Sequence, residues 1–144
     1  YVLQGYYVFR DVSGSQFWGV DPEFNYRLAS RVQGSVGLSY NESTDDAQWY
    51  NNYATSTGTA YTFARLQQRT ASITARMDYT LTPTMSVQLY AQPFVTAGDY
   101  SNLRALANPR ADRYVDRFVQ FNDAVPSDFN FKQFRSNTVF RWEY

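Results

Sequence analysis

The sequence is dominated by long runs in which apolar and polar residues alternate. In "MSVQLYAQ", residues 85–92, every second residue is apolar: Met85, Val87, Leu89 and Ala91. Side chains of a strand point alternately to its two faces, so the pattern predicts a strand with one apolar and one polar face. A soluble barrel or sandwich would bury the apolar face in a core, whereas a membrane barrel would present it to lipid.

Runs of this kind, separated by turn residues, predict about eight antiparallel strands. They cover residues 1–12, 17–28, 31–42, 45–54, 59–68, 70–81, 84–97 and 129–144. Ordinary strands have about 5–6 residues, whereas about 9–11 tilted residues cross a bilayer. The predicted lengths therefore favour an all-β, up-and-down transmembrane β-barrel. About eight strands alone would leave a lumen filled by side chains with no open channel, and a polar channel becomes possible only if further strands complete a larger barrel.

The predicted links differ in length between the two ends of the sheet. Short links at 29–30, 56–58 and 82–84 would share one end. The other end would hold the links at 13–15, 43–44 and 68–69 and the long segment 98–128. This distribution is typical of short periplasmic turns opposite longer external loops.

The long segment 98–128 contains a second pattern. Asn108 could cap a helix, Pro109 suits a first helical position, and Tyr114, Val115 and Phe118 then follow helical spacing. We predict a short amphipathic helix at about 109–120. Two interpretations remain open: a plug or lid over the barrel mouth, or a loop helix that packs on the rim.

Charged residues alternate with the apolar ones, which places them on the polar faces. The predicted lumen-facing set is Arg10, Asp21, Glu23, Arg27, Arg31, Asp46, Arg65, Arg76, Asp78, Arg135, Arg141 and Glu143. Each would cost several kcal/mol in a soluble core unless it found a partner, whereas a lumen offers both partners and water. Lys132 is the only lysine among the 13 basic residues, and arginine suits paired, partly buried positions better. A soluble sandwich that turns the same charges to solvent remains the rival interpretation.

Aromatic residues make up 19% of the chain and gather near the predicted strand ends. The set is Trp18, Tyr26, Tyr40, Trp49, Tyr53, Tyr79, Phe94, Trp142 and Tyr144. Such residues form the interface girdles of membrane barrels. The alternative is that they are ordinary strand aromatics in a core.

Candidate catalytic and metal-binding groups are few. The chain has no cysteine and no histidine, which removes thiol nucleophiles and the commonest general base. Asp21 and Glu23 share a face, but Arg27 and Arg31 beside them favour ion pairs over glycoside chemistry. Glu42, Asp45 and Asp46 form a weak calcium candidate without the spacing of a calcium loop, and a solvated acidic turn is the favoured interpretation. We expect no enzyme activity, metal or cofactor, and the net charge of +0 gives no reason to expect nucleic-acid binding.

Three stretches also resemble a known family. They are "SRVQGSVGLSYNESTDDAQWY", "YTFARLQQRTASITARMDYTLTPTMSVQLYAQPFVTAGDYS" and "DFNFKQFRSNTVFRWEY". They are similar to the barrel region of a bacterial family of unknown function (DUF5916-like), in which a carbohydrate-binding family-9-like domain precedes an outer-membrane β-barrel. The resemblance implies an outer-membrane location, an upstream signal peptide and sugar-binding-like domain, and further strands. It brings no catalytic residues.

These observations lead to one leading expectation and one alternative. The leading expectation is a non-enzymatic barrel segment, residues 1–144, in the bacterial outer membrane. Its first partner would be the lipid bilayer. The barrel would either pass or handle saccharides, or bind other envelope proteins as a subunit of a complex. The N-terminal "YVLQGYYVF" does not match a signal peptide, so we expect a mature protein or a fragment. The alternative is a soluble all-β module that binds a ligand or a protein.

Overall fold

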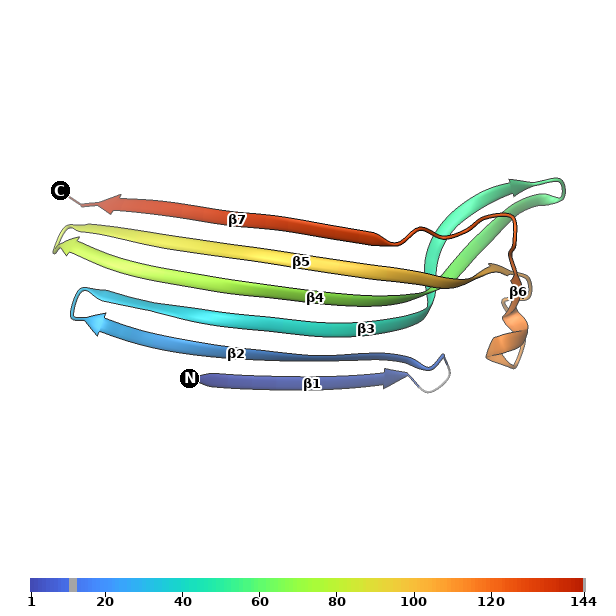
Figure 1. Cartoon of the computed structure of the whole chain (residues 1–144), viewed down its shortest axis with the longest axis horizontal. Coiled ribbons are helices and arrows are strands. Elements are labelled where there is room, and N and C mark those ends of the chain that lie inside the picture. Colours follow the sequence, from blue (N-terminus) through green and yellow to red (C-terminus); the bar gives the residue numbers. More distant parts are fainter. Residues whose placement is uncertain (11–12, 144) are drawn as a thin grey trace.

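The computed structural model describes residues 1–10 and 13–143, which form one antiparallel sheet of 7 strands (Figure 1). The strands are β1 (Val2–Arg10), β2 (Ser15–Ala29), β3 (Val32–Thr55), β4 (Gly58–Thr82), β5 (Met85–Leu106), β6 (Phe118–Gln120) and β7 (Phe129–Trp142). Each strand from β1 to β5 pairs with the next, and β6 and β7 both pair with β5. The predicted all-β, up-and-down architecture is confirmed. The sheet is not closed into a barrel: within the described residues, β1 forms one edge, and β6 and β7 form the other along different parts of β5.

The turns predicted at 43–44 and 68–69 are wrong. β3 and β4 run through these positions as single strands of 24 and 25 residues, in which Ser43 pairs with Gln68 and Thr44 with Gln67. At these positions apolar residues no longer occupy every second place, but the chain does not turn. Two pairs of predicted strands are therefore one strand each, and the predicted acidic turn at Asp45 and Asp46 is part of β3.

The turns at 30–31, 56–57 and 83–84 lie where short links were predicted. Their distribution differs from the prediction, because the long β3–β4 hairpin carries the 56–57 turn to the opposite end from the other two (Figure 1). β7 ends beside the 83–84 turn, whereas β1 begins opposite Glu23 of β2, short of the 30–31 turn. One end of the sheet thus has only short turns, and the other has the hairpin and the long segment.

The register keeps side chains of one kind on one face of the sheet, because paired residues share a face. What we call the apolar face carries Leu3, Tyr7 and Phe9; Trp18, Val20, Pro22, Phe24, Tyr26 and Leu28; Val32, Gly34, Val36, Leu38 and Tyr40; Ala71, Ile73, Ala75, Met77 and Tyr79; Met85, Val87, Leu89, Ala91, Pro93 and Val95; and Lys132, Phe134, Ser136, Thr138, Phe140 and Trp142. The intervening residues form the polar face. The alternating faces predicted for β2, β3, β4 and β5 thus align across the sheet.

Aromatic rings cover glycines on neighbouring strands. The opposed pairs are Tyr6 with Gly19, Tyr26 with Gly34, and Phe129 with Gly98. A Cβ added to Gly34 would lie 2.7 Å from the Tyr26 hydroxyl oxygen and would overlap the Arg76 carbonyl oxygen. An aromatic ring lying over a strand glycine restores the packing that glycine lacks and helps to fix the register.

Two irregularities in β3 divide the sheet into two regions. The register shifts between Asp45 and Gln48 and again between Trp49 and Asn51. Bulges bend and twist a strand, and in Figure 1 the β3–β4 hairpin bends away from the rest of the sheet. We call residues 44–66 and 99–128 the distal end, and the rest of the described sheet the band.

The helix predicted at 109–120 is wrong. Only Tyr114–Arg117 are helical, as the 3-10 helix η1, and Phe118 already begins β6. The Asn108 side chain accepts a hydrogen bond from the Arg110 backbone N–H in a local turn and caps no helix. Pairing of β6 with Arg104–Leu106 of β5 then holds the following residues extended. No helix among the described residues is long and apolar enough to cross a bilayer.

The buried apolar side chains all lie at the distal end. They are Ala64, Leu66, Leu103, Ala105 and Phe121. In the band, the buried residues of the described sheet are glycines, such as Gly19, or small polar residues, such as Ser35 and Thr96. The band is therefore a single layer of strands, and neither of its faces packs against a hydrophobic core within the described chain.

Candidate functional site

The apolar face of the band is exposed and almost free of charge. Phe24 is 56% exposed, Leu28 76% and Phe134 66%. Among the described strands, no charged side chain occurs on this face between Lys132 and the turns at 30–31 and 83–84. Soluble monomers rarely expose an apolar surface of this extent, which makes this face the main candidate interaction surface of the described chain.

Aromatic and charged residues mark the border of the apolar face toward the distal end. The Trp18 and Tyr40 rings lie 5.4 Å apart, and one row further Arg69 Nε lies 3.4 Å from Glu42 Oε1. At the opposite border, the predicted interface aromatics Tyr26, Tyr79 and Trp142 also belong to the apolar face. The face is thus a strip with aromatic residues at both borders.

The polar face of the band carries a ladder of side-chain hydrogen bonds. The Thr96 hydroxyl lies 2.9 Å from that of Thr70 and accepts a 3.0 Å bond from the Gln68 amide. Further along, Tyr90 donates a 2.8 Å bond to Gln92, and the Arg76 guanidinium lies 5.6 Å from the Tyr90 ring centre. These groups partner one another within and between strands, which suits a surface that faces water.

Most of the predicted lumen-facing charges share this polar face. They are Arg10, Asp21, Glu23, Arg27, Arg76, Asp78, Arg135 and Arg141. Arg31 lies in the 30–31 turn, where its guanidinium donates a 3.4 Å bond to the Leu81 carbonyl, and Glu143 follows β7. None of the ion pairs found in the described part of the chain joins two of the ten side chains named in this paragraph.

Several predicted site residues lie elsewhere. Asp46 and Arg65, expected to face the lumen, lie at the distal end on the side that continues the apolar face. Among the predicted interface aromatics, Phe94 lies on the polar face, opposite Ser72 and Gln133, and Trp49 lies in the distal hairpin. Tyr53 also belongs to the distal hairpin, and Tyr144 lies outside the described residues. For Asp46, Arg65, Trp49 and Tyr53 the physical reason is the continuation of β3 and β4, which carries these positions beyond the band. Phe94 has the parity of Gln92 along β5, which places it on the polar face.

Asp46 is the centre of the densest polar cluster among the described residues. Its carboxylate accepts hydrogen bonds from Arg65 Nη1 (3.3 Å), Arg104 Nη2 (3.1 Å) and the Tyr114 hydroxyl (3.1 Å). Arg104 Nη2 also donates to the Asp46 backbone carbonyl, and the Asp46 N–H donates to the Ser15 hydroxyl. The cluster joins β2, β3, β4, β5 and η1.

The cluster is shielded from solvent by aromatic rings. The side chains of Asp46 and Arg104 are only 11% and 12% exposed, and the Arg104 guanidinium lies 4.6 Å from the Phe118 ring centre. Arg104 Nε is the buried side-chain nitrogen in the described part of the chain that has no hydrogen-bond partner. Burial, and then the hydrogen bond to Asp46, raises the pKa of Tyr114, so its hydroxyl keeps the proton that it donates.

The long segment holds both sides of the distal sheet. Tyr114 and Phe118 lie on the Asp46 side, where Phe118 packs against Phe63 with ring centres 5.8 Å apart. Beyond β6, Phe121 stacks on Tyr53 at 5.1 Å and packs with Ala64, Leu103 and Ala105 in the distal core. The segment therefore wraps around the edge of β5 and fixes the distal end from two sides.

The predicted calcium candidates do not meet. Glu42 lies beside Arg69 and Asp46 is surrounded by donors, whereas an Asp45 oxygen accepts the N–H of Ala47. No group of three or more histidine, cysteine, aspartate or glutamate residues suitable for a metal occurs in the described ranges. Asp21 and Glu23 share the polar face, as predicted, with no histidine or cysteine in the chain to act beside them.

Sequence reasoning missed Arg104 and misassigned Tyr114. Arg104 lies 58 residues from Asp46 in sequence, in a segment taken as a loop, and so gave no signal of a shared site. Tyr114 was expected to contribute only apolar surface, but its hydroxyl is what reaches Asp46. Recognising "NLRAL" as part of β5 would have placed Arg104 on a strand, but its face depends on the register shift between Ser101 and Arg104.

The fold and these surfaces define an all-β protein made of one two-faced antiparallel sheet. The chain belongs to the family described as Domain of unknown function (DUF5916), whose model matches residues 1–144. No curated protein and no solved structure matches the chain.

Proposed function

We propose that this chain is a non-enzymatic part of the wall of an outer-membrane β-barrel, with its apolar face on lipid and its polar face on a water-filled interior. The observation that carries the proposal is the exposed apolar face of the band. Along β4, Ala71, Ile73, Ala75, Met77 and Tyr79 alternate with Ser72, Thr74, Arg76 and Asp78. Lipid-facing strands have this pattern, because one face meets hydrocarbon and the other meets water.

The length of the apolar strip supports the proposal. On β3 the strip extends from Val32 to Tyr40, nine residues, and about 9–11 tilted residues cross a bilayer. Glu42 and Arg69 then meet at the border, where an ion pair would be in the headgroup region rather than in hydrocarbon. Beyond this border the same face continues with the polar cluster around Asp46, as expected for strands that leave the membrane.

The two ends of the sheet support an orientation. The end with the 30–31 and 83–84 turns has only short links, which is typical of periplasmic turns. The distal end, with its long hairpin and the 107–128 segment, corresponds to the external side. The distal core and the Asp46 cluster make this part self-supporting in water.

The polar face indicates what the interior would meet. Hydroxyl and amide groups such as Thr70, Thr96 and Gln68 line its centre, with the Phe94 and Phe131 rings 5.6 Å apart beside them. Hydroxyl, amide and aromatic groups suit passage or handling of saccharides, in keeping with the sugar-binding-like domain that the family resemblance implies. A barrel that serves as a subunit of an envelope complex would use the same wall.

Cell fractionation with a gel assay tests the proposal. We expect the protein in the outer-membrane fraction, resistant to urea and carbonate extraction, with a mobility that changes on heating in detergent. Val36→Asp on the apolar face should abolish the heat-modifiable form, whereas Ser35→Asp on the polar face should keep it. A protein released in soluble form without detergent would overturn the proposal in favour of a soluble all-β binding module.

A further inference from the structure

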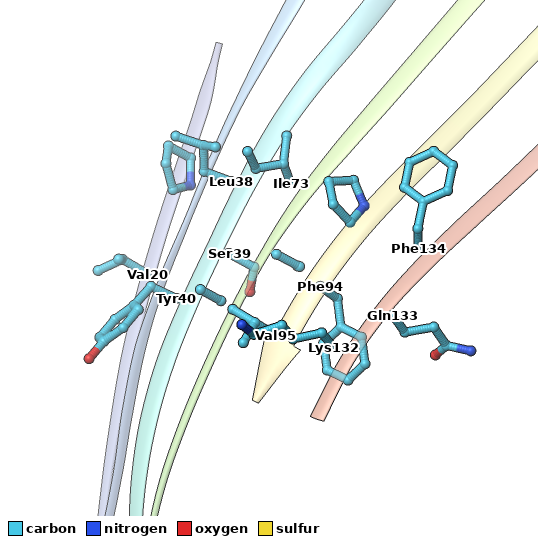
Figure 2. Close-up of a pocket in the computed structure, with 14 residues that line it drawn as sticks. Val20, Leu38, Ser39, Tyr40, Ile73, Phe94, Val95, Lys132, Gln133 and Phe134 are labelled. Carbon is cyan, nitrogen blue, oxygen red and sulfur yellow. The ribbon is translucent and has the colours of Figure 1, made fainter. Parts of the chain in front are cut away.

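The apolar face has a hollow near its border with the distal end. It has a volume of about 760 Å³ and spans β2, β3, β4, β5 and β7 (Figure 2). Its floor follows one row of the sheet, in which Pro22, Leu38, Ile73, Pro93 and Phe134 are neighbours. Ala71, with its small side chain, leaves room in the next row toward the distal end.

Two prolines account for the position of the hollow. Proline has no N–H to donate to a ladder and is rare in the interior of a sheet. Pairing of β2 with β3 is interrupted between Val20 and Glu23, around Pro22, and pairing of β4 with β5 is interrupted around Pro93. Both prolines keep their outer partners, on β1 and β7. The two ladder gaps therefore flank the central β3–β4 pair on the same row.

One positive charge belongs to the lining of the hollow. Lys132 is the only charged residue among those that line it, and it pairs with Val95 in the row of Tyr40 and Ala71. In Figure 2 its side chain extends from β7 over the hollow. No acidic residue lines the hollow, and the described ion pairs do not include Lys132.

We propose that this hollow is a binding site for one lipid with an anionic headgroup, whose acyl chain fills the Pro22–Pro93 row and whose phosphate binds Lys132. The inference rests on the proposed membrane location. Lys132 lies one row inside the Glu42–Arg69 border, so its apolar stem covers the lining while the ammonium group reaches the headgroup region. The nearby Arg69 is already paired with Glu42, which leaves Lys132 as the cation for the phosphate.

Quenching of a single tryptophan by brominated lipids tests the site. Trp18 lies beside Tyr40, a lining residue, so Trp49→Phe and Trp142→Phe leave it as the one reporter near the hollow. The protein is placed in phosphatidylcholine vesicles that contain either brominated phosphatidylglycerol or brominated phosphatidylcholine. We expect quenching to report about a five-fold preference for the anionic lipid, since one basic residue contributes about that factor near a headgroup.

Matched variants separate the lysine and the hollow from general effects. Lys132→Gln should reduce the preference to about one, whereas Arg135→Gln, on the polar face of the same strand, should leave it unchanged. Ala71→Leu, inside the hollow, should weaken the preference, and Ala91→Leu, on the same face outside the lining, should not.

The outcomes distinguish the lipid site from the membrane location. Equal quenching by both lipids, or a preference that survives Lys132→Gln, overturns the site while leaving the protein in the bilayer. No quenching by either lipid overturns the proposed membrane location and the site together.

Discussion

The band and the distal end are made by the same strands but are stabilised in different ways. At the distal end, Phe121 and Leu103 pack in a core and Asp46 holds Arg104 and Tyr114. In the band, apolar side chains such as Phe24 and Leu28 point outward and cover nothing within the described chain. Within the described residues, the chain supplies its own core only at the distal end, where we propose that water surrounds it. In the band, we propose that the bilayer supplies the apolar phase.

Removal of the Asp46 carboxylate should have the largest effect, confined to the distal end. Asp46→Ala leaves the Arg104 guanidinium buried without its counter-charge and should destabilise the distal end by about 3–5 kcal/mol. Hydrogen exchange should show the loss at the β5–β6 pairing and not in the band. Glu42→Ala, at the exposed pair with Arg69, is the control and should cost less than about 1 kcal/mol. Similar losses in both variants would contradict the distinction.

An arginine on the apolar face should be the next largest change. Leu89→Arg should lower the free energy of unfolding from lipid vesicles by about 2–4 kcal/mol, because the charge would enter hydrocarbon. Gln88→Arg, the neighbouring residue on the polar face, should cost far less. Denaturant titration in vesicles measures both. A larger cost at Gln88 than at Leu89 would reverse the assignment of the two faces.

Two glycines of β3 test packing within the band. In Gly34→Ala the new methyl group would meet the Tyr26 ring and the Arg76 carbonyl oxygen, so we expect a loss of about 1–3 kcal/mol. Gly37→Ala has its nearest neighbours at 3.9 Å and should be within about 0.5 kcal/mol of the parent protein. Both values come from the same unfolding titration, and equal effects would mean that the Tyr26–Gly34 pairing does not fix this part of the sheet.

Alkaline pH should weaken the distal end by a smaller amount. The pKa of Tyr114 is raised from 10.0, mainly by burial and then by Asp46, so its contribution is present at lower pH and is lost as pH rises through the raised value. The loss of one hydrogen bond to a charged group corresponds to about 1.5 kcal/mol. Hydrogen exchange in β6 at matched pH values should show the effect, and Tyr114→Phe should remove this part of the pH dependence. An unchanged profile in that variant would assign the effect to another group.

Much of the band was predictable from the sequence, and the distal end was not. Strict alternation defined the faces around Leu89 and Ile73, because a period of two has only one consistent register against an apolar environment. The same rule failed at Ser43 and Gln68, where alternation weakened because the proposed environment changes from lipid to water while the strand continues. Arg104 reaches Asp46 only through the bulges and the fold of the whole sheet, which single-strand patterns do not encode.

We propose that the two faces of the band meet different solvents. A nitroxide scan of residues 70–77 on β4, in lipid vesicles, measures this directly through collision with oxygen and with a water-soluble nickel complex. We expect a period of two, in which labels at Ala71, Ile73, Ala75 and Met77 favour oxygen and those at Thr70, Ser72, Thr74 and Arg76 favour nickel. Equal accessibility along the strand, or the opposite phase, would contradict a lipid-facing apolar surface.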